Sequence, residues 1–338
     1  MVGVPSSGPI LEVRGLRLVI GGDEGLAKVL DHIDFTLERG RILGVVGESG
    51  CGKSTIIRAI IGILPEGARV EAGTIRFDGE DLLSLGEHEL NTRIRGSRIG
   101  FIPQDPYLAL NPVFKVGTQL LEIMRWHAPD DAMGRKGREQ RHRDRIVALL
   151  RRVQLPEPEA ALERYPHQFS GGQRQRLVIA AALAASPALV IADEPTTALD
   201  VTTQQQILDL LRDLAGEFGL SMLFVTHDLG VVAQLCDDLC VIYAGQTVES
   251  GDTGDILGCP RHPYTKALLA CHPERAIAFS GIPGTVPSPL RATPGCRFAP
   301  RCNEARDACA ERRPHLSVDA SGRRVDCILY DQPELVAT

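Results

Sequence analysis

The 338-residue sequence has no apolar run long enough to cross a bilayer, no excess of positive charge and no internal repeat. Its longest apolar stretch, residues 177–192, is interrupted by Ser186 and Pro187 and ends at Asp193 and Glu194. That stretch is too short and too broken for a membrane span, and it favours a buried helix followed by a buried strand. The net charge of −6 argues against a general nucleic-acid-binding protein, so we expect no nucleic acid among its partners.

The N-terminal sequence, MVGVPSSGPILEV, lacks the basic segment and apolar run of a secretory signal peptide. We therefore expect the chain in the cytosol, where thiols stay reduced and clustered cysteines more often bind metal than form disulfides. The chain is long enough for one large domain and a smaller one. After about residue 251 the composition shifts toward Pro, Gly, Cys and Arg, which predicts a domain boundary near that point.

Alternating apolar residues predict strands at 10–18 and 33–37, with a GGDEG turn at 21–25 between them. The run at 41–46 predicts a central strand, and residues 54–64 have the apolar spacing of a helix. A polar, arginine-rich stretch at 128–145 interrupts the pattern and precedes a helical segment that reaches residue 153. Strands are predicted at 188–193 and 222–228, on either side of a helix at about 204–218. Strands that alternate with helices predict an α/β fold with a parallel sheet covered on both faces.

A glycine-rich loop, GESGCGKS at 47–54, matches the phosphate-binding pattern G-x-x-x-x-G-K-[ST] and lies between a predicted strand and helix. Such a loop points backbone N–H groups at phosphate oxygens, and the helix that follows adds partial positive charge. Lys53 is expected to reach the β- and γ-phosphates, and Ser54 to bind Mg²⁺. The predicted nucleotide-binding residues are Gly47, Glu48, Ser49, Gly50, Cys51, Gly52, Lys53, Ser54 and Thr55, with Gln104 from a separate segment.

An acidic pair ends the predicted strand at 188–193. Asp193 is expected to hold the Mg²⁺ shell, and Glu194 could accept a proton from an attacking water. Such a pair by itself is more often a solvated strand end. Downstream of a phosphate-binding loop, the functional interpretation is favoured.

The segment FSGGQRQR at 169–176 narrows the prediction. Taken singly, Ser-Gly-Gly-Gln is a turn that opens a helix, a histidine after a strand is more often structural, and Gln104 could simply cap a loop. Taken together and in this order, four features resemble the motifs of ATP-binding cassette (ABC) ATPases: Gln104, FSGGQRQR, the ALD sequence at 198–200, and His227. The resemblance covers essentially the whole chain. Phe169 stands where leucine is commoner in that family, and Ile20 or a neighbour where an aromatic residue usually stacks on adenine.

The resemblance implies a P-loop NTPase fold of the ABC type, which combines a parallel-sheet core, an antiparallel β part and a helical subdomain with a small cysteine-rich C-terminal domain. We expect the nucleotide-binding domain at 1–255, its helical subdomain at about 106–175, and the C-terminal domain at 256–338.

The resemblance also assigns roles within an ATP site. Glu194 is the expected catalytic base, and His227 is expected to contact the γ-phosphate and to hold Glu194 and water in line. The predicted Mg²⁺ ligands are Ser54, Gln104 and Asp193. The signature residues Ser170, Gly171, Gly172 and Gln173 would face the ATP of a second subunit, with Asp200 in the adjoining D-loop. One chain would then hold half of each composite site, and the working ATPase would be a dimer.

Several longer segments resemble the ATPase subunits of dipeptide, oligopeptide and nickel importers. These are QDPYLALNPVFKVGTQLLE at 104–122, EPTTALDV at 194–201, HPYTKALL at 262–269, and the tail sequences GIPG and PGCRFAPRC. The resemblance implies a peripheral ATPase on the cytoplasmic face of the membrane. Its partners would be a second ABC ATPase in a heterodimer, two transmembrane permeases and an extracytoplasmic solute-binding protein. Import of nickel or another small solute, and a soluble ABC ATPase unrelated to transport, remain alternatives.

Four of the nine cysteines, Cys296, Cys302, Cys309 and Cys327, lie in the last fifth of the chain with the spacing C-x5-C-x6-C-x17-C. Four thiolates suit a tetrahedral zinc or a [4Fe–4S] cluster, and the absence of a C-x2-C pair disfavours a zinc ribbon. Eight arginines between residues 291 and 324 could offset the charge of a thiolate-bound cluster. The resemblance adds that some peptide-importer ATPases carry an iron–sulfur cluster here. Unrelated thiols or zinc remain the alternatives.

Overall fold

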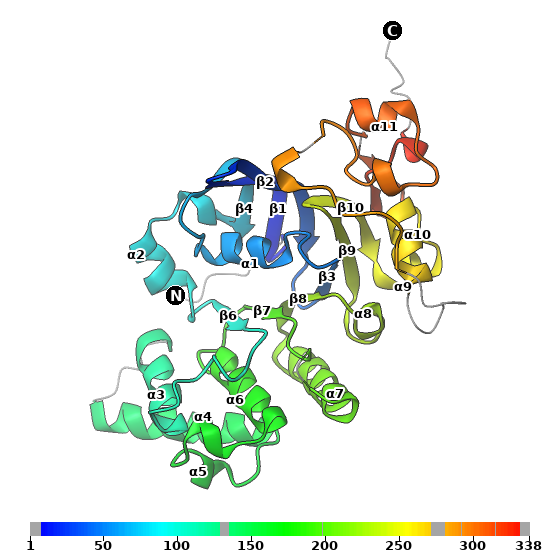
Figure 1. Ribbon diagram of the computed structural model, residues 1–338. Coiled ribbons are helices and arrows are strands. Elements are labelled where there is room, and N and C mark those ends of the chain that lie inside the picture. Colours follow the sequence, from blue (N-terminus) through cyan, green and yellow to red (C-terminus); the bar gives the residue numbers. More distant parts are fainter. Residues whose placement is uncertain are drawn as a thin grey trace. The chain divides into compact units, whose positions relative to one another are not determined.

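The structure, a computed structural model, describes residues 8–128, 135–197, 199–271, 281–291, 293–314 and 316–331. It divides into two compact units (Figure 1). The first comprises Met1–Glu38, Ile42–Leu83 and Val225–Thr338, and the second comprises Arg39–Arg41 and Ser84–Phe224. None of the helices in the described ranges has both the length and the apolar character that crossing a membrane requires.

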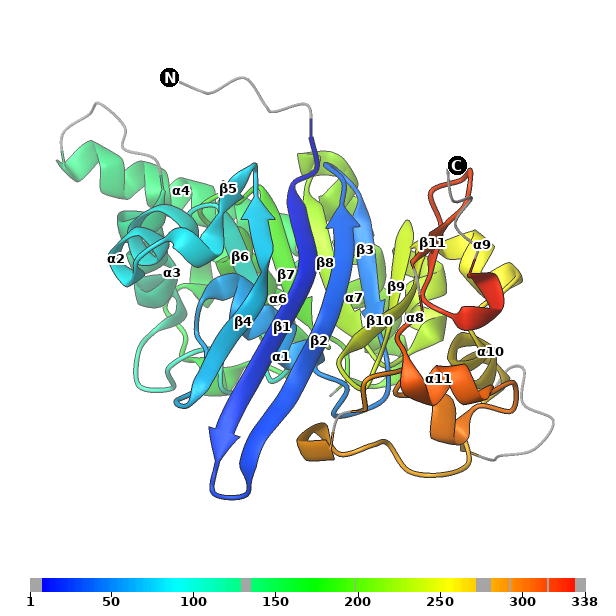
Figure 2. The ribbon, with the colours of Figure 1, turned by 90° about the horizontal axis from the view of Figure 1, so that it is seen from above.

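An antiparallel sheet forms one part of the first unit (Figure 2). Its strands, in the order β2-β1-β4-β5, are β1 (Leu11–Gly22), β2 (Gly25–Leu37), β4 (Ala68–Phe77) and β5 (Glu80–Asp81). The β1–β2 pairing continues as far as Gly22 opposite Gly25, so the expected strands at 10–18 and 33–37 were too short. Val19 and Ile20 are good strand formers and extend the ladder. Gly25, with φ of 117°, helps to make a tighter turn than the expected five-residue one.

The remaining strands of the first unit lie in the order β11-β12-β10-β9-β3. They are β3 (Ile42–Val46), β9 (Asp238–Tyr243), β10 (Gln246–Asp252), β11 (Ser317–Val318) and β12 (Arg324–Val325). Strand β3 is fully buried and runs parallel to β9, whereas β9, β10 and β12 pair antiparallel. Two short strands from the C-terminal segment therefore extend this sheet beyond β10.

The helices of the first unit are short. They are α1 (Lys53–Ile61), α8 (Leu229–Leu235), α9 (Thr253–Gly258), α10 (Pro263–Ala270) and α11 (Asp307–Glu311), with 3₁₀ turns at Pro289–Arg291, Ala299–Arg301 and Ile328–Tyr330. Helix α1 buries Ile56, Ile57 and Ile60 and stops at Gly62, whose left-handed backbone closes the helix. The expected helix at 54–64 is thus present but shorter.

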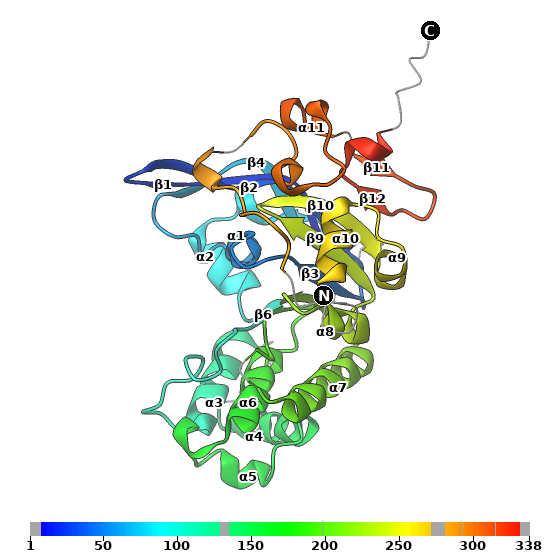
Figure 3. The ribbon, with the colours of Figure 1, turned by 45° about the vertical axis from the view of Figure 1, so that its right-hand side comes forward.

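The second unit is mainly helical (Figure 3). Its helices are α2 (Glu87–Glu89), α3 (Val116–His127), α4 (Arg135–Arg152), α5 (Pro158–Ala161), α6 (Gly171–Leu183) and α7 (Val201–Phe218). A π-helical turn lies at Leu90–Ile94, and 3₁₀ turns lie at Leu82–Ser84 and Pro166–Gln168. The turn at Leu82–Ser84 crosses the division between the units. The strands of the second unit lie in the order β8-β7-β6, where β8 is Ser221–Thr226 and also crosses that division, β7 is Leu189–Asp193 and β6 is Ile99–Ile102. Strands β6 and β7 run parallel.

The arginine-rich stretch differs from its prediction. Much of it belongs to α4, which contacts α3, α5 and α6. Arg, Lys, Glu and Gln have high helix propensity, so a polar sequence can extend a helix whose apolar end is packed. That packed end includes Ile146 and Leu150, which are buried, as is Val153 directly after the helix.

Candidate functional site

The glycine-rich loop connects β3 to α1, as its sequence predicts. Gly50 and Gly52 have φ of 80° and 104°, a backbone conformation that side-chain-bearing residues rarely adopt. A Cβ atom on Gly47 would lie 2.1 Å from the carbonyl oxygen of Ile242, so this position admits no side chain. The loop therefore has the tight, amide-rich backbone of a phosphate-binding site.

Lys53 is 7% exposed, and its ammonium closes the loop. Its Nζ donates to the carbonyl oxygens of Gly47, at 2.7 Å, and Glu48, at 3.2 Å. Cys51 lies within the same loop and is 2% exposed, and burial raises the pKa of its thiol. Cys51 is therefore a poor nucleophile despite its position, and the Lys53 ammonium lies against the carbonyl oxygens of the loop.

The phosphate loop has a second support that the sequence reasoning missed. The Glu48 N–H donates to the hydroxyl oxygen of Tyr264 at 3.0 Å, and Arg301 donates to both carboxylate oxygens of Glu48, at 2.8 and 3.2 Å. Tyr264 belongs to the HPYTKALL segment and Arg301 to PGCRFAPRC. The family-typical sequences were the available signal, but nothing in their spacing indicated a contact with the loop.

In the second unit, Glu194 directly follows β7 and Gln104 follows β6. Gln104 Nε2 donates to Glu194 Oε2 at 3.2 Å, and Thr197 Oγ1 donates to the same oxygen at 3.0 Å. Glu194 has a φ of 45°, an uncommon value for a non-glycine residue. Two residues that the sequence predicted in one site are thus brought together, and Thr197 is an addition to them.

The signature segment opens α6. Ser170 is the N-cap, its hydroxyl accepts from the Gln173 N–H at 3.3 Å, and the Gln173 side chain accepts from the Ser170 N–H at 3.1 Å. This reciprocal capping box fixes the first turn of α6. The Arg174 guanidinium lies 4.4 Å from the ring centroid of Tyr107, so the segment after Gln104 contacts the signature.

Asp200 caps α7 by accepting from the Thr203 N–H at 3.0 Å and from its hydroxyl at 2.7 Å. These hydrogen bonds hold the pKa of Asp200 below its usual value. A Cβ atom on Gly172 would lie 2.7 Å from a Thr203 methyl group, so the signature and the start of α7 are closely packed. Ala198 of the predicted D-loop lies outside the described residues.

The other predicted residues occupy strand and helix ends. His227 is exposed directly after β8, and Asp228 caps α8 by accepting from the Gly230 N–H at 2.8 Å. Ser54 lies in α1 and Asp193 ends β7. Within the described part of the chain, no group of three or more His, Cys, Asp or Glu side chains is arranged to hold a metal ion.

The four tail cysteines line one small cavity of about 20 Å³, roughly the space of a single water molecule. Burial raises the pKa of Cys296 to about 12 and that of Cys327 to about 11, with smaller contributions from the neighbouring thiols. The Arg306 N–H donates to Cys309 Sγ at 3.3 Å. The four cysteines therefore do come together around one cavity, although among the described residues their sulfur atoms are not arranged as metal ligands.

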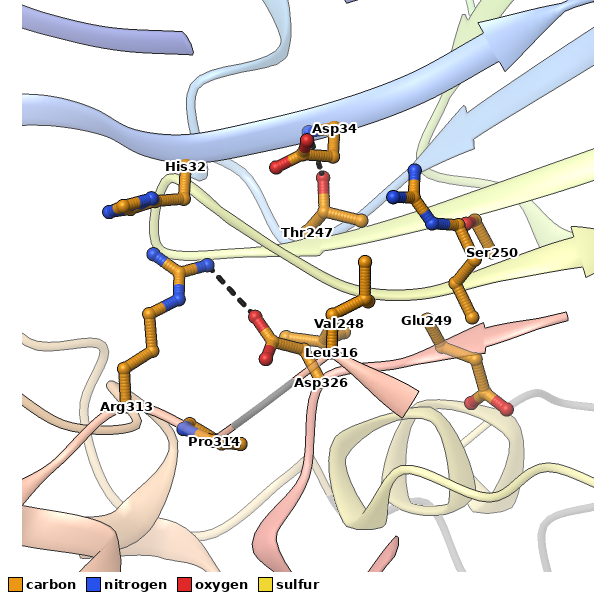
Figure 4. Close-up of a pocket in the computed structure, with 11 residues that line it drawn as sticks. His32, Asp34, Thr247, Val248, Glu249, Ser250, Arg313, Pro314, Leu316 and Asp326 are labelled. Carbon is orange, nitrogen blue, oxygen red and sulfur yellow. Dashed lines mark hydrogen bonds and ion pairs between the residues drawn. The ribbon is translucent and has the colours of Figure 1, made fainter. Parts of the chain in front are cut away.

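A separate cavity of about 150 Å³ lies against β2 and β10 of the first unit (Figure 4). Three of its charged groups are paired within the protein: Arg313 contacts Asp326 at 2.8 Å, and Asp34 accepts from the Gly15 N–H at 3.0 Å. Burial raises the pKa of Asp326. This cavity is a junction where the C-terminal segment meets the sheet, and it has none of the phosphate-binding features of the loop at 47–54.

Two protein families match the chain. The ABC transporter family matches residues 30–197, and the C-terminal region of oligopeptide/dipeptide transporters matches residues 248–309. A dimeric ATP-binding cassette in a post-hydrolysis state with ADP and Pi has a TM-score of 0.61 and 27% identity, over 72% of this chain and 98% of that one. A dimeric bacterial ABC transporter cassette gives a TM-score of 0.61 at 28% identity, with the same coverage of both chains.

Relatives along almost the whole chain carry related descriptions. A probable peptide ABC transporter ATP-binding protein from Sinorhizobium fredii is 43% identical over 96% of both chains. An oligopeptide transport ATP-binding protein from Bacillus subtilis is 40% identical over 96% of this chain and 97% of its own length. A dipeptide transport ATP-binding protein from Escherichia coli is 40% identical over 94% and 96%. The chain therefore belongs to the ABC transporter ATPases, in the group that carries the oligopeptide/dipeptide transporter C-terminal region.

Proposed function

We propose that this chain binds and hydrolyses ATP to power the import of dipeptides or oligopeptides. The observation that carries the proposal is the loop at 47–54, with Lys53 placed over its carbonyl groups, in a chain whose relatives are described as peptide transport ATP-binding proteins. The same ATPase role for nickel or another small solute is the second candidate, because the loop recognises phosphate and not the transported solute.

The proposed mechanism assigns each step to a residue of this chain. Lys53 would neutralise charge on the β- and γ-phosphates, while Ser54, Gln104 and Asp193 would hold Mg²⁺. Glu194 would take a proton from the attacking water, and His227 would contact the γ-phosphate. The hydrogen bond from Gln104 to Glu194 supports a link between the nucleotide and the segment that follows Gln104.

We propose that the active form is a heterodimer in which the signature of each subunit completes the other subunit's ATP site. The capped start of α6, with its remaining N–H groups, supports a phosphate contact from the partner. The neighbouring segment exposes Tyr107, Leu108, Val113 and Phe114, with Leu108 85% exposed. Such an exposed apolar cluster supports docking on membrane permeases. On this proposal the chain would act at the cytoplasmic face of the membrane, with an extracytoplasmic binding protein on the other side.

Glu194→Gln tests the proposed catalytic base. Glutamine keeps the size and hydrogen bonding of the side chain but cannot accept the proton, so we expect ATP turnover to fall at least about 100-fold. ATP binding should persist, and the nucleotide-bound dimer should accumulate in size-exclusion chromatography. Glu163→Gln, at a surface ion pair with Lys115, is the matched control and should keep full turnover. Near-normal hydrolysis by Glu194→Gln at its own site would contradict this role.

Affinity purification from membranes tests the transport assignment. We expect two permeases and a second ABC ATPase to be recovered with the tagged chain. Recovery of ribosomal or nucleic-acid components in their place would contradict the proposal and favour an ABC ATPase unrelated to transport.

A second proposal concerns the tail: Cys296, Cys302, Cys309 and Cys327 hold a [4Fe–4S] cluster with a structural or regulatory role. It is supported by the convergence of four thiols on one cavity and by the backbone hydrogen bond to Cys309 Sγ. The donor set fits the cluster in kind and number, whereas the cavity as it stands has room for only a small ion. The raised thiol pKa values mean that any bound metal must displace protons.

Anaerobic purification with iron and sulfide assays tests the cluster. We expect about four irons and four sulfides per chain, with a broad visible absorption that Cys309→Ser removes. Cys259→Ser is the matched control, because Cys259 is exposed and does not line the cavity. A colourless protein that holds zinc, or no metal after reconstitution, would contradict the proposal.

A further inference from the structure

Arg301 connects the C-terminal segment that carries the four tail cysteines, residues 296–327, to the phosphate loop at 47–54. It lies on the 3₁₀ turn Ala299–Arg301, directly before Cys302. Besides Glu48, its guanidinium donates to the Tyr243 hydroxyl at 3.1 Å and to the carbonyl oxygens of Ile282, at 2.8 Å, and Pro283, at 2.9 Å. A side chain held by this many partners has a fixed position, so Arg301 is a rigid attachment point for Glu48.

The charge of Glu48 needs such a partner. Its carboxylate belongs to a loop built to bind phosphates, and an unpaired anion there would repel the triphosphate. The Arg301 side chain is 4% exposed and that of Glu48 is 27% exposed, so their bidentate contact is largely shielded from water. Charge-assisted bidentate pairs are stronger and more directional than neutral hydrogen bonds. The pair therefore both neutralises Glu48 and sets its orientation.

The backbone of Glu48 is held from the same side. Its N–H donates to Tyr264, and its carbonyl oxygen accepts from Lys53 Nζ. Tyr264 packs against Tyr243 and Phe298, with ring centroids 4.6 Å apart for the Tyr243 pair and 5.4 Å apart for the Phe298 pair. Phe298 is itself part of the cysteine segment. A displacement of this segment would thus reach the carbonyl group that Lys53 contacts.

We propose that Arg301 is a positioning residue for the phosphate loop, through which the C-terminal segment contributes to the affinity of the loop for ATP. The proposal rests on the proposed function, since it takes the loop at 47–54 as the ATP site. Arg301 acts through Glu48 and has no part in the chemical step.

The test measures the ATP dissociation constant of the purified full-length chain by isothermal titration calorimetry. Arg301→Ala should weaken binding about tenfold, which corresponds to about 1.4 kcal/mol. Adding Glu48→Gln should restore most of that loss, because the double variant no longer carries an unpaired carboxylate beside the phosphates. Arg301→Lys should be intermediate, since it keeps the charge and loses the bidentate geometry.

Arg313→Ala is the matched control. It removes another arginine–carboxylate pair of the C-terminal segment, with Asp326, that does not contact the loop. It should leave ATP affinity unchanged even if it lowers thermal stability. Unchanged affinity in Arg301→Ala, an equal loss in Arg313→Ala, or no recovery in the double variant would overturn the proposal.

Lys53→Ala separates this proposal from the proposed function. If Lys53→Ala abolishes ATP binding while Arg301→Ala does not weaken it, the loop is the ATP site and the positioning role is wrong. If Lys53→Ala binds ATP normally, the loop is not the ATP site and the proposed function itself fails.

Discussion

Two arginine–glutamate pairs attach the C-terminal segment to the rest of the first unit, and they differ in what their glutamates do. Arg301 holds Glu48 of the phosphate loop, whereas Arg323 donates to Glu249 of β10, with Nε 3.1 Å from Oε1. Both arginine side chains are at most 5% exposed. The Glu249 side chain is 0% exposed, while that of Glu48 is 27% exposed. One pair borders a ligand site, and the other is enclosed by protein.

Glu249 also accepts from the backbone N–H groups of Arg261, at 3.0 Å, and His262, at 3.1 Å. Two residues further on, Tyr264 accepts from the Glu48 N–H. The His-Pro-Tyr sequence thus links the two pairs. The same kind of ion pair therefore has two roles. The enclosed pair, Arg323–Glu249, fixes where α10 begins, and the bordering pair, Arg301–Glu48, fixes the phosphate loop that Tyr264 of α10 contacts. We expect the enclosed pair to control stability and the bordering pair to control ATP affinity.

The largest effect is expected from Glu249→Ala. It leaves the Arg323 guanidinium buried without its carboxylate and leaves two backbone N–H groups unpaired, so the free energy of unfolding should fall by roughly 3–5 kcal/mol. Urea denaturation followed by circular dichroism measures this loss. A loss of ATP binding free energy in the folded Glu249→Ala protein that exceeds its loss of unfolding free energy would contradict the division of roles between the two pairs.

Acid should lower the free energy of unfolding by a smaller amount, through His262 beside the enclosed pair. Burial lowers the pKa of His262 from 6.5 to about 3, and its Nδ1 accepts from the Tyr264 N–H. Because the unfolded chain takes up a proton that the folded chain resists, stability should be full above pH 6.5 and decline as pH falls toward 3.

His262→Asn, which can still accept at the helix start, is the matched variant for this acid effect. Urea midpoints compared between pH 7 and pH 4 should fall less for His262→Asn than for the native chain. The same decline in both proteins would assign the acid sensitivity to other groups.

Tyr264→Phe should have a moderate effect on the phosphate-loop side. It removes the hydroxyl that accepts from the Glu48 N–H but keeps the ring packed on Tyr243 and Phe298. We expect about 1 kcal/mol of lost ATP binding energy, typical of one hydrogen bond, with little change in thermal stability. Isothermal titration calorimetry measures it. A large drop in melting temperature without a change in ATP affinity would show that Tyr264 stabilises the fold, as the enclosed pair does, and does not support the ATP site.

The smallest effect is expected from Lys266→Ala. Lys266 pairs with Glu304 at 3.3 Å, and both side chains are over 40% exposed. Such a surface pair contributes about 0–1 kcal/mol and is screened by salt. Thermal denaturation at low and high salt should separate the variant from the native chain only at low salt. A loss comparable to that in Glu249→Ala would remove the distinction between enclosed and exposed pairs.

The elements that the sequence predicted well are those with strong local signals. The loop at 47–54 and the helix after it were recognisable because glycines at fixed offsets define the backbone, and α7 because Ile207, Leu210 and Leu214 repeat on one face. The hairpin length was wrong because the two turn residues, Asp23 and Glu24, lack the Asn-Gly or Asp-Gly sequence that marks a two-residue turn. The extent of α4 was missed because a polar helix has no apolar period until its packed end.

Contacts between distant segments were beyond the sequence. Gln104 and Glu194 were predicted in one site from a resemblance, and they do contact each other. Arg301 and Glu48 are 253 residues apart, and each has an ordinary interpretation alone: one arginine among many, and one variable position of a loop. The two side chains meet where Tyr243, Tyr264 and Phe298, rings from segments far apart in the sequence, pack against one another.

The two short strands of the C-terminal segment have a practical consequence for work with this protein. Strand β12 pairs with β10 at Glu249 and Ser250, and the Asp326 N–H donates to the Val248 carbonyl oxygen at 2.9 Å. A truncation after residue 255 would uncover the edge of β10 and leave backbone groups open to pairing with another chain. A core cut at the boundary that the sequence predicts should therefore self-associate on expression, so the chain is best handled whole.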